Sequence, residues 1–115
     1  MAFERVCSLD EIAVDEAKAV DCGPLQVALV RDGDEVFAIQ DLCSHASVAL
    51  SEGEVTVDAS GCFMECWLHG STFDLRTGKP TILPATEPVA TFAVEVRGAD
   101  VYVDVDAVLN GVTPA

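Results

Sequence analysis

The sequence predicts an all-β fold, and three observations carry that prediction. Short runs of aliphatic and β-branched residues recur along the chain, and Gly, Pro and Asp punctuate them as turns do. Half of the 115 residues are apolar, which is enough for a buried core and too many for a disordered chain. This length suits one domain, so we expect residues 1–115 to form a single β-barrel or β-sandwich.

The first element is a short helical turn that begins near residue 9. Ser8 and Glu11 have the spacing of a capping box, in which each side chain accepts a hydrogen bond from the other residue's backbone N–H. The acidic run 10–16 that follows is predicted to be a solvated face. Three strands come next, separated by turn signals at Cys22-Gly23-Pro24 and Arg31-Asp32-Gly33-Asp34 that predict two hairpin connections. These strands are Ala17–Val20, Leu25–Val30 and Val36–Gln40.

The second half is also rich in strand patterns, with turn signals at 58–61, 76–78 and 98–100. The predicted strands are Glu54–Val57, Cys62–Cys66, Ser71–Leu75, Val89–Val96 and Val101–Val105. Three aromatic residues fall on strand patterns and are predicted core residues, namely Phe37, Phe92 and Tyr102. Arg76 and Lys79 are interpreted as turn residues, and the tail from residue 107 to 115 is predicted to fray.

The charge balance excludes several classes of partner. Six basic and 20 acidic residues leave a net charge of −14, which repels nucleic acid and anionic lipid headgroups. No apolar run approaches the roughly 18 residues of a membrane span, and the first residues lack the basic and apolar regions of a signal peptide. We therefore expect a soluble, cytoplasmic protein. The acidic surface is also suited to steering a basic partner.

The cysteine count favours metal binding or buried thiols over disulfides. Five cysteines, an odd number, occur without an export signal. Cys7, Cys22 and Cys62 are interpreted as ordinary small side chains, although strand alternation places Cys62 on the same face as Cys66.

The two histidines of the chain each lie close to a cysteine, in Cys43-Ser-His45 and Cys66-Trp-Leu-His69. Twenty residues, 46 through 65, separate the two pairs, and one hairpin in that interval would bring both loop tips together. Two thiolates and two imidazoles hold either a tetrahedral zinc ion or a [2Fe–2S] cluster with mixed ligands. Because each loop supplies one cysteine and one histidine, the spacing favours the cluster over a zinc finger.

At this point the residues resemble a known family. Cys-x-His followed by Cys-x-x-His-Gly is similar to the Rieske signature, and residues 66–78 resemble Rieske-type ferredoxins. The resemblance extends through Phe37–Leu50 and residues 83–88. It implies a Rieske-like antiparallel β-sandwich with a cluster-binding subdomain made of two loops, at about 41–50 and 64–74, and a third loop with Pro84 at about 80–88.

The resemblance also implies roles for individual residues. Cys43 and Cys66 would bind the inner iron, and His45 and His69 the outer iron. Ser71 matches the family position whose hydroxyl bonds a cluster sulfur.

The same resemblance gives an expectation for the reduction potential. Phe73 stands where high-potential members carry a tyrosine, and Val48 and Trp67 stand where those members carry an extra pair of cysteines. These departures predict a potential in the lower part of the range of roughly −150 to +300 mV for Rieske centres.

The function implied is that of a monomeric electron carrier, not an enzyme by itself, between a flavin-dependent ferredoxin reductase and a non-haem iron ring-hydroxylating oxygenase. Trp67 and Leu68 lie between two ligands, where an apolar docking patch is one interpretation. Three alternatives stay open. Residues 65–84 also resemble Rieske proteins that accompany iron–sulfur cluster assembly in actinobacteria; the same ligands fit a structural zinc module; and some nitrite reductase small subunits are cluster-free, although retention of all four ligand residues disfavours that reading.

Overall fold

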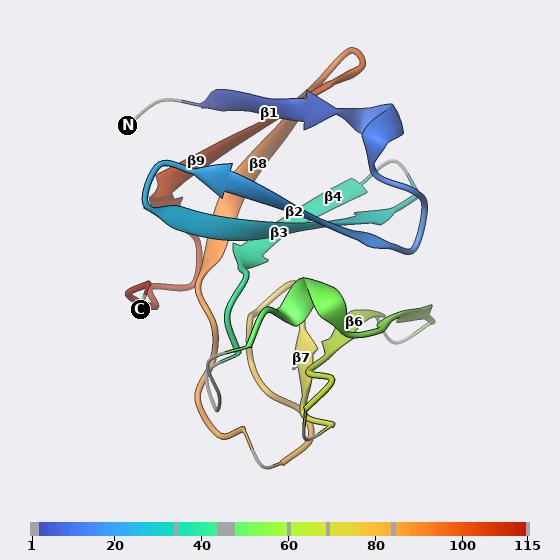
Figure 1. Ribbon diagram of the computed structural model, residues 1–115, viewed down its shortest axis with the longest axis vertical. Coiled ribbons are helices and arrows are strands. Elements are labelled where there is room, and N and C mark those ends of the chain that lie inside the picture. Colours follow the sequence, from blue (N-terminus) through green and yellow to red (C-terminus); the bar gives the residue numbers. More distant parts are fainter. Residues whose placement is uncertain are drawn as a thin grey trace.

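The computed structural model describes residues 3–33, 35–43, 48–59, 61–68, 70–83 and 85–114 (Figure 1). Within these ranges the regular elements are β-strands and two single 3-10 turns, so the predicted all-β class is confirmed. The elements are β1 Glu4–Ser8, η1 Leu9–Glu11, β2 Ala17–Cys22, β3 Leu25–Asp32, β4 Glu35–Gln40, η2 Leu50–Glu52, β5 Val55–Asp58, β6 Gly61–Glu65, β7 Thr72–Asp74, β8 Thr91–Arg97 and β9 Asp100–Val108. No described segment forms a helix long and apolar enough to cross a membrane.

The strands form two antiparallel sheets. The larger sheet has six strands in the order β1-β9-β8-β4-β3-β2, and its edge strands β1 and β2 come into contact, so the sheet curls toward a barrel. The smaller sheet has three strands in the order β5-β6-β7. In chain order the smaller sheet lies between β4 and β8, which are neighbours in the larger sheet (Figure 1). Both ends of the smaller unit are therefore held by one pair of adjacent strands.

The turn signals in the sequence correspond to tight hairpins. The closing pairs in the strand register are Cys22 with Leu25, Asp32 with Glu35, Asp58 with Gly61 and Arg97 with Asp100. The predicted hairpin between the two Cys/His pairs is the β5–β6 hairpin.

The N-terminal region confirms one prediction and adds a strand that the sequence pattern did not reveal. The Ser8 N–H donates to the Glu11 carboxylate over 2.6 Å, as a capping box requires, and η1 begins at Leu9. The preceding residues 4–8 form β1, which pairs with β9 through contacts such as Arg5 with Tyr102. A five-residue strand with such a distant partner has no local turn signal that would identify it.

The prediction that residues 107–115 fray is wrong for the first part of this tail. Strand β9 continues to Val108, and the Leu109 N–H donates to the Thr91 carbonyl over 2.8 Å. The Asn110 amide donates to the carbonyls of Thr77 and Val89, over 2.9 and 2.7 Å. These hydrogen bonds tie the tail to the segment that links the two sheets.

Two buried cores result, because β3 is covered on both of its faces. Val27 and Leu29 belong to the core inside the larger sheet, whereas Ala28 and Val30 belong to a second core beneath the smaller sheet. We call this second cluster the interface core. Its buried members are Ala28, Val30, Ile39, Cys43, Leu50, Cys62, Met64, Cys66, Phe73, Leu75, Ala85 and Val89.

The three aromatic residues predicted to be core residues have different environments. Phe92 is buried inside the larger sheet, and Phe37 is half-buried against the interface core. Tyr102 is also half-buried, but the Arg97 guanidinium covers its ring with 4.6 Å between the guanidinium carbon and the ring centroid. The Arg76 guanidinium covers the Phe37 ring in a similar way, at 4.9 Å, but Phe37 also packs against the interface core. Tyr102 packs against neither core, so the prediction for Tyr102 is wrong.

Candidate metal centre

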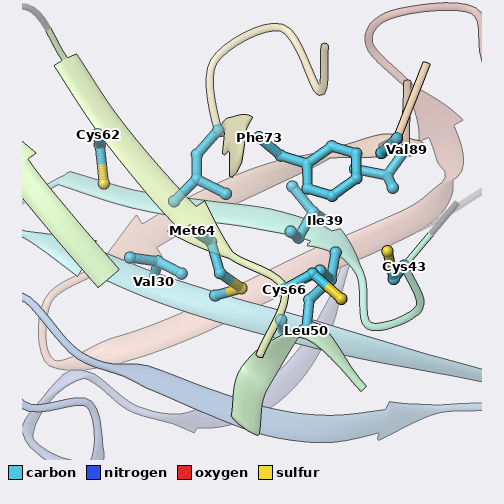
Figure 2. Packing of buried hydrophobic residues seen from close by; sticks show 12 residues of the cluster. Val30, Ile39, Cys43, Leu50, Cys62, Met64, Cys66, Phe73 and Val89 are labelled. Atoms are coloured by element: carbon cyan, nitrogen blue, oxygen red, sulfur yellow. The ribbon is translucent and has the colours of Figure 1, made fainter. Parts of the chain in front are cut away.

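The two cysteines of the Cys/His pairs lie where strands end. Cys43 follows β4 and Cys66 directly follows β6, and both side chains are at least 95% buried in the interface core. Figure 2 shows their sulfur atoms at the same end of this core, with Cys62 at the opposite end. His45 and His69 lie outside the described residues. The structure therefore brings the two thiols into one cluster from two separate loops.

The first loop is closed by backbone hydrogen bonds close to Cys43. The Leu42 N–H donates to the Gln40 carbonyl over 2.8 Å, and the Cys43 N–H donates to the Val48 carbonyl over 3.0 Å. Val48 itself packs against the interface core. The turn after β4 thus points the Cys43 side chain into the core.

The second loop folds back on itself around Cys66. The Cys66 N–H donates to the Ser71 carbonyl over 2.6 Å, and the Gly70 N–H donates to the Cys66 carbonyl over 2.9 Å. Gly70 has a φ of 77°, a conformation that residues with a Cβ rarely adopt. Trp67 and Leu68 form the outer part of this loop and are 50% and 43% exposed. They are not core residues, as the docking interpretation of the sequence requires.

Ser71 is fully buried between this loop and the third loop. Its Oγ accepts a hydrogen bond from the Ala85 N–H over 2.9 Å. A hydroxyl that accepts in this way still has its own proton to donate. Among the described residues no hydrogen bond uses that proton. Ser71 is therefore a buried hydrogen-bond donor that directly follows Gly70. Pro84, the proline of the third loop, lies outside the described residues.

The other three cysteines are buried thiols. All five cysteines are free of disulfides, as the odd count predicted. Burial raises the pKa of the Cys62 thiol to about 12, and it also raises the pKa values of Cys7 and Cys22. Such buried thiols are protonated at neutral pH and pack as small apolar side chains. Cys62, Met64 and Cys66 share one strand face, so the predicted alternation is confirmed.

Among the described residues, no group of three or more His, Cys, Asp and Glu side chains is placed to hold a metal ion. Both histidines lie outside the described residues, so this result concerns the cysteine, aspartate and glutamate side chains alone.

Comparison with known proteins identifies the family. The family model of the Rieske [2Fe-2S] domain matches residues 2–93. The chain belongs to the Rieske [2Fe–2S] domain family. The resemblance read from the two Cys/His pairs is thereby confirmed.

Relatives of this Rieske chain are ferredoxins of oxygenase systems. The ferredoxin component of biphenyl 2,3-dioxygenase from Rhodococcus jostii (strain RHA1) is 42% identical over 113 residues, covering 98% of this chain and 99% of the relative. The ferredoxin subunit of 3-phenylpropionate/cinnamic acid dioxygenase from Escherichia coli (strain K12) is 41% identical over 98 residues, covering 85% of this chain and 89% of the relative.

Solved structures agree with this fold. The ferredoxin of carbazole 1,9a-dioxygenase from Nocardioides aromaticivorans IC177 superimposes with a TM-score of 0.84 at 40% identity, covering 90% of this chain and 97% of that one. A second similar structure, with a TM-score of 0.79 at 34% identity, covers 88% of this chain and 91% of that one. It is the complex of reduced oxygenase and oxidized ferredoxin in carbazole 1,9a-dioxygenase.

The described residues fit the cofactor of this family. A Rieske-type [2Fe–2S] cluster has two cysteine thiolates on one iron and two histidines on the other. Cys43 and Cys66 supply two buried sulfur atoms from facing loops, and Ser71 supplies a buried hydroxyl donor. The donor set of the described residues is therefore that of the cysteine half of a Rieske centre.

Two neighbours of these residues were not singled out from the sequence. The Ala85 N–H orients Ser71, and the buried Asp41 lies two residues before Cys43. A charged residue between an apolar strand and a cysteine of a Cys/His pair is a usable signal for Asp41, whereas an alanine carries no such signal.

Proposed function

We propose that this chain is the ferredoxin component of a ring-hydroxylating dioxygenase system and carries single electrons. One observation carries the proposal, namely the 42% identity to a dioxygenase ferredoxin component along 98% of the chain. The chain is an electron-transfer protein and does not itself catalyse the oxygenation. When bound, the [2Fe–2S] cluster accepts and returns one electron.

We assign four ligands to that cluster: Cys43 and Cys66 on the inner iron, and His45 and His69 on the outer iron. Burial of both thiols in the interface core and the folding of each loop by its own backbone hydrogen bonds support the cysteine pair. The cluster-binding loops are then about 41–50 and 64–74, within a single domain that spans 1–115.

Ser71 has a supporting role in this assignment. Its hydroxyl proton is available, and the Ala85 N–H holds the oxygen in place on the side of the third loop, about 80–88. A hydroxyl donor beside a cluster sulfur stabilises the reduced cluster more than the oxidised one, because the reduced form carries more negative charge. Ser71 therefore raises the reduction potential.

We propose that the terminal oxygenase docks on an apolar patch beside the ligands. This docking patch consists of Trp67, Leu68, Ile82 and Leu83, which are 50%, 43%, 55% and 72% exposed. The two loops that carry it are joined, since the Thr81 N–H donates to the Thr72 carbonyl over 2.6 Å. The related complex of an oxygenase with its ferredoxin supports this partner. A flavin-dependent ferredoxin reductase would use the same surface to deliver the electron.

We also propose that the protein works as a monomer in the cytoplasm. The five free cysteines support this compartment, because reducing conditions keep thiols unpaired.

The test is an EPR-monitored redox titration of anaerobically purified protein, with iron, zinc and acid-labile sulfide measured on the same sample. A rhombic Rieske-type signal with two irons and two sulfides per chain is expected. Zinc without iron or sulfide would refute the assignment and indicate a structural zinc module. With the cluster present, reconstituted turnover with a reductase and an oxygenase is expected; activity only with cluster-assembly proteins would refute the dioxygenase role.

A further inference from the structure

A buried carboxylate lies at the base of the first ligand loop. Asp41 comes directly after β4, and it is 4% exposed. Its backbone N–H donates to the Gln26 carbonyl over 2.9 Å, which attaches this residue to β3. Burial of an acidic side chain is costly unless its oxygens are hydrogen-bonded. The partners of this carboxylate therefore indicate what it does.

Both carboxylate oxygens of Asp41 bind one residue at the other end of the loop. Oδ1 accepts from the Ser51 N–H over 2.7 Å, and Oδ2 accepts from the Ser51 Oγ–H over 2.6 Å. The segment between these residues contains Cys43, whose N–H is bonded to the Val48 carbonyl. The Asp41–Ser51 pair thus joins the two ends of the loop that carries the first ligand pair.

The 3-10 turn that contains Ser51 lies against β6, the strand that leads to Cys66. Ser51 lies in η2, and Gly53 follows that turn so closely against Glu65 that a Cβ at Gly53 would overlap the Glu65 carbonyl oxygen. The Glu65 N–H also donates to the Glu54 carbonyl over 2.8 Å. Glu65 directly precedes Cys66. A continuous set of contacts therefore runs from Asp41 through η2 to the residue before Cys66.

We propose that Asp41 is a positioning residue for the metal centre: its two hydrogen bonds to Ser51 hold Cys43 in place relative to Cys66. The inference rests on the proposed function, since it assigns the two cysteines to one iron. It depends on the two hydrogen bonds and not on the negative charge. A side chain that keeps both bonds should therefore keep the centre.

Three variants distinguish a role of the two hydrogen bonds from a role of the negative charge. Asp41→Ala removes both hydrogen bonds. Asp41→Asn keeps them, because its amide oxygen accepts from the Ser51 N–H and its amide nitrogen donates to the Ser51 Oγ. Ser51→Ala removes only the bond from Oγ. The matched control is Asp104→Ala, which removes another buried aspartate, on β9 in the larger sheet, whose carboxylate accepts from the Asp106 N–H over 3.0 Å.

The measurements are the rate of iron release from the holoprotein to the chelator bathophenanthroline disulfonate and the EPR g-values of the reduced protein. Outer residues that orient metal ligands typically change metal affinity about 10- to 100-fold, so we expect iron release from Asp41→Ala to accelerate by about that factor, with shifted g-values. Ser51→Ala should be intermediate. Asp41→Asn and Asp104→Ala should release iron at the wild-type rate with unchanged g-values.

The inference is overturned if Asp41→Ala matches the wild type in both measurements, or if Asp41→Asn is as labile as Asp41→Ala. If Asp41→Ala does not fold by circular dichroism, Ser51→Ala decides: a wild-type release rate then overturns the inference. A wild-type protein without a Rieske signal would instead refute the proposed function. The two failures are therefore distinguishable.

Discussion

Substitution of Gly53 by alanine tests how the segments that carry Cys43 and Cys66 are joined. Gly53 has a φ of −89°, which any residue adopts, so the backbone itself does not require glycine. An added Cβ would overlap the Glu65 carbonyl oxygen and lie 2.9 Å from the Glu65 carbonyl carbon. Because both groups belong to the backbone, η2 or β6 has to move.

The magnitude follows from three contributions. Overpacking costs about 1–3 kcal/mol, and the hydrogen bond between the Glu65 N–H and the Glu54 carbonyl contributes about 1 kcal/mol that is lost if the segments separate. The reduced freedom of the unfolded chain returns about 0.4–1 kcal/mol. We expect Gly53→Ala to lower the free energy of unfolding by about 1–4 kcal/mol, which for this length lowers Tm by roughly 4–20 °C.

The matched control is Gly98→Ala in the β8–β9 turn. Gly98 has a φ of 62° and its Cβ would meet nothing within 4 Å, so only the left-handed backbone is penalised, by about 1 kcal/mol. Thermal unfolding by circular dichroism measures both losses, and iron content measures the effect on the centre. The reasoning is refuted if Gly98→Ala loses more stability than Gly53→Ala, or if Gly53→Ala keeps wild-type stability and full iron.

Four further predictions concern single side chains. Ser71→Ala should lower the reduction potential in a redox titration, because the reduced cluster loses a donor; an unchanged potential contradicts the role assigned to its hydroxyl. Asn110→Ala loses four hydrogen bonds to the backbone and should cost about 2–4 kcal/mol in urea unfolding; a loss below about 1 kcal/mol would show that water replaces them. Leu83→Ser should slow electron transfer to the oxygenase, whereas Leu109→Ser, 66% exposed but outside the docking patch, should not; equal rates argue against the patch. Burial raises the pKa of the Cys62 thiol from its ordinary value of 9.0 to about 12, so the folded state binds this proton more tightly than the unfolded chain does. The free energy of unfolding should therefore fall as the pH rises above 9. The contribution of this thiol falls by about 1.4 kcal/mol per pH unit there, and Cys62→Ala should remove that slope.

Much of the fold could be read from local signals. Eight of the nine described strands coincide with runs of aliphatic and β-branched residues, and their hairpin turns follow Gly, Pro and Asp. β1 was missed, and residues 107–110 were expected to fray, for one reason: both are held by partners far along the chain. Tyr102 falls on a strand pattern, but Val101 and Val103 take the buried face of β9, and the structure places the Arg97 guanidinium over the Tyr102 ring.

The sequence by itself determined the chemistry of this protein, because the pairing of one cysteine with one histidine in each of two loops is a local pattern that specifies a mixed-ligand iron–sulfur centre. Only the tertiary structure decided what holds these loops in register. The Asp41 carboxylate accepts hydrogen bonds from Ser51, and the Ala85 N–H orients the Ser71 hydroxyl. Gly53 lacks a Cβ and so leaves room for the Glu65 backbone. Gly53 and Glu65 lie side by side at the end of the β5–β6 hairpin, but the Asp41–Ser51 and Ser71–Ala85 hydrogen bonds join residues that are not neighbours in any strand or turn pattern. They exist because packing of the smaller sheet against β3 and β4 buries polar groups, and buried polar groups must find partners wherever the fold places them.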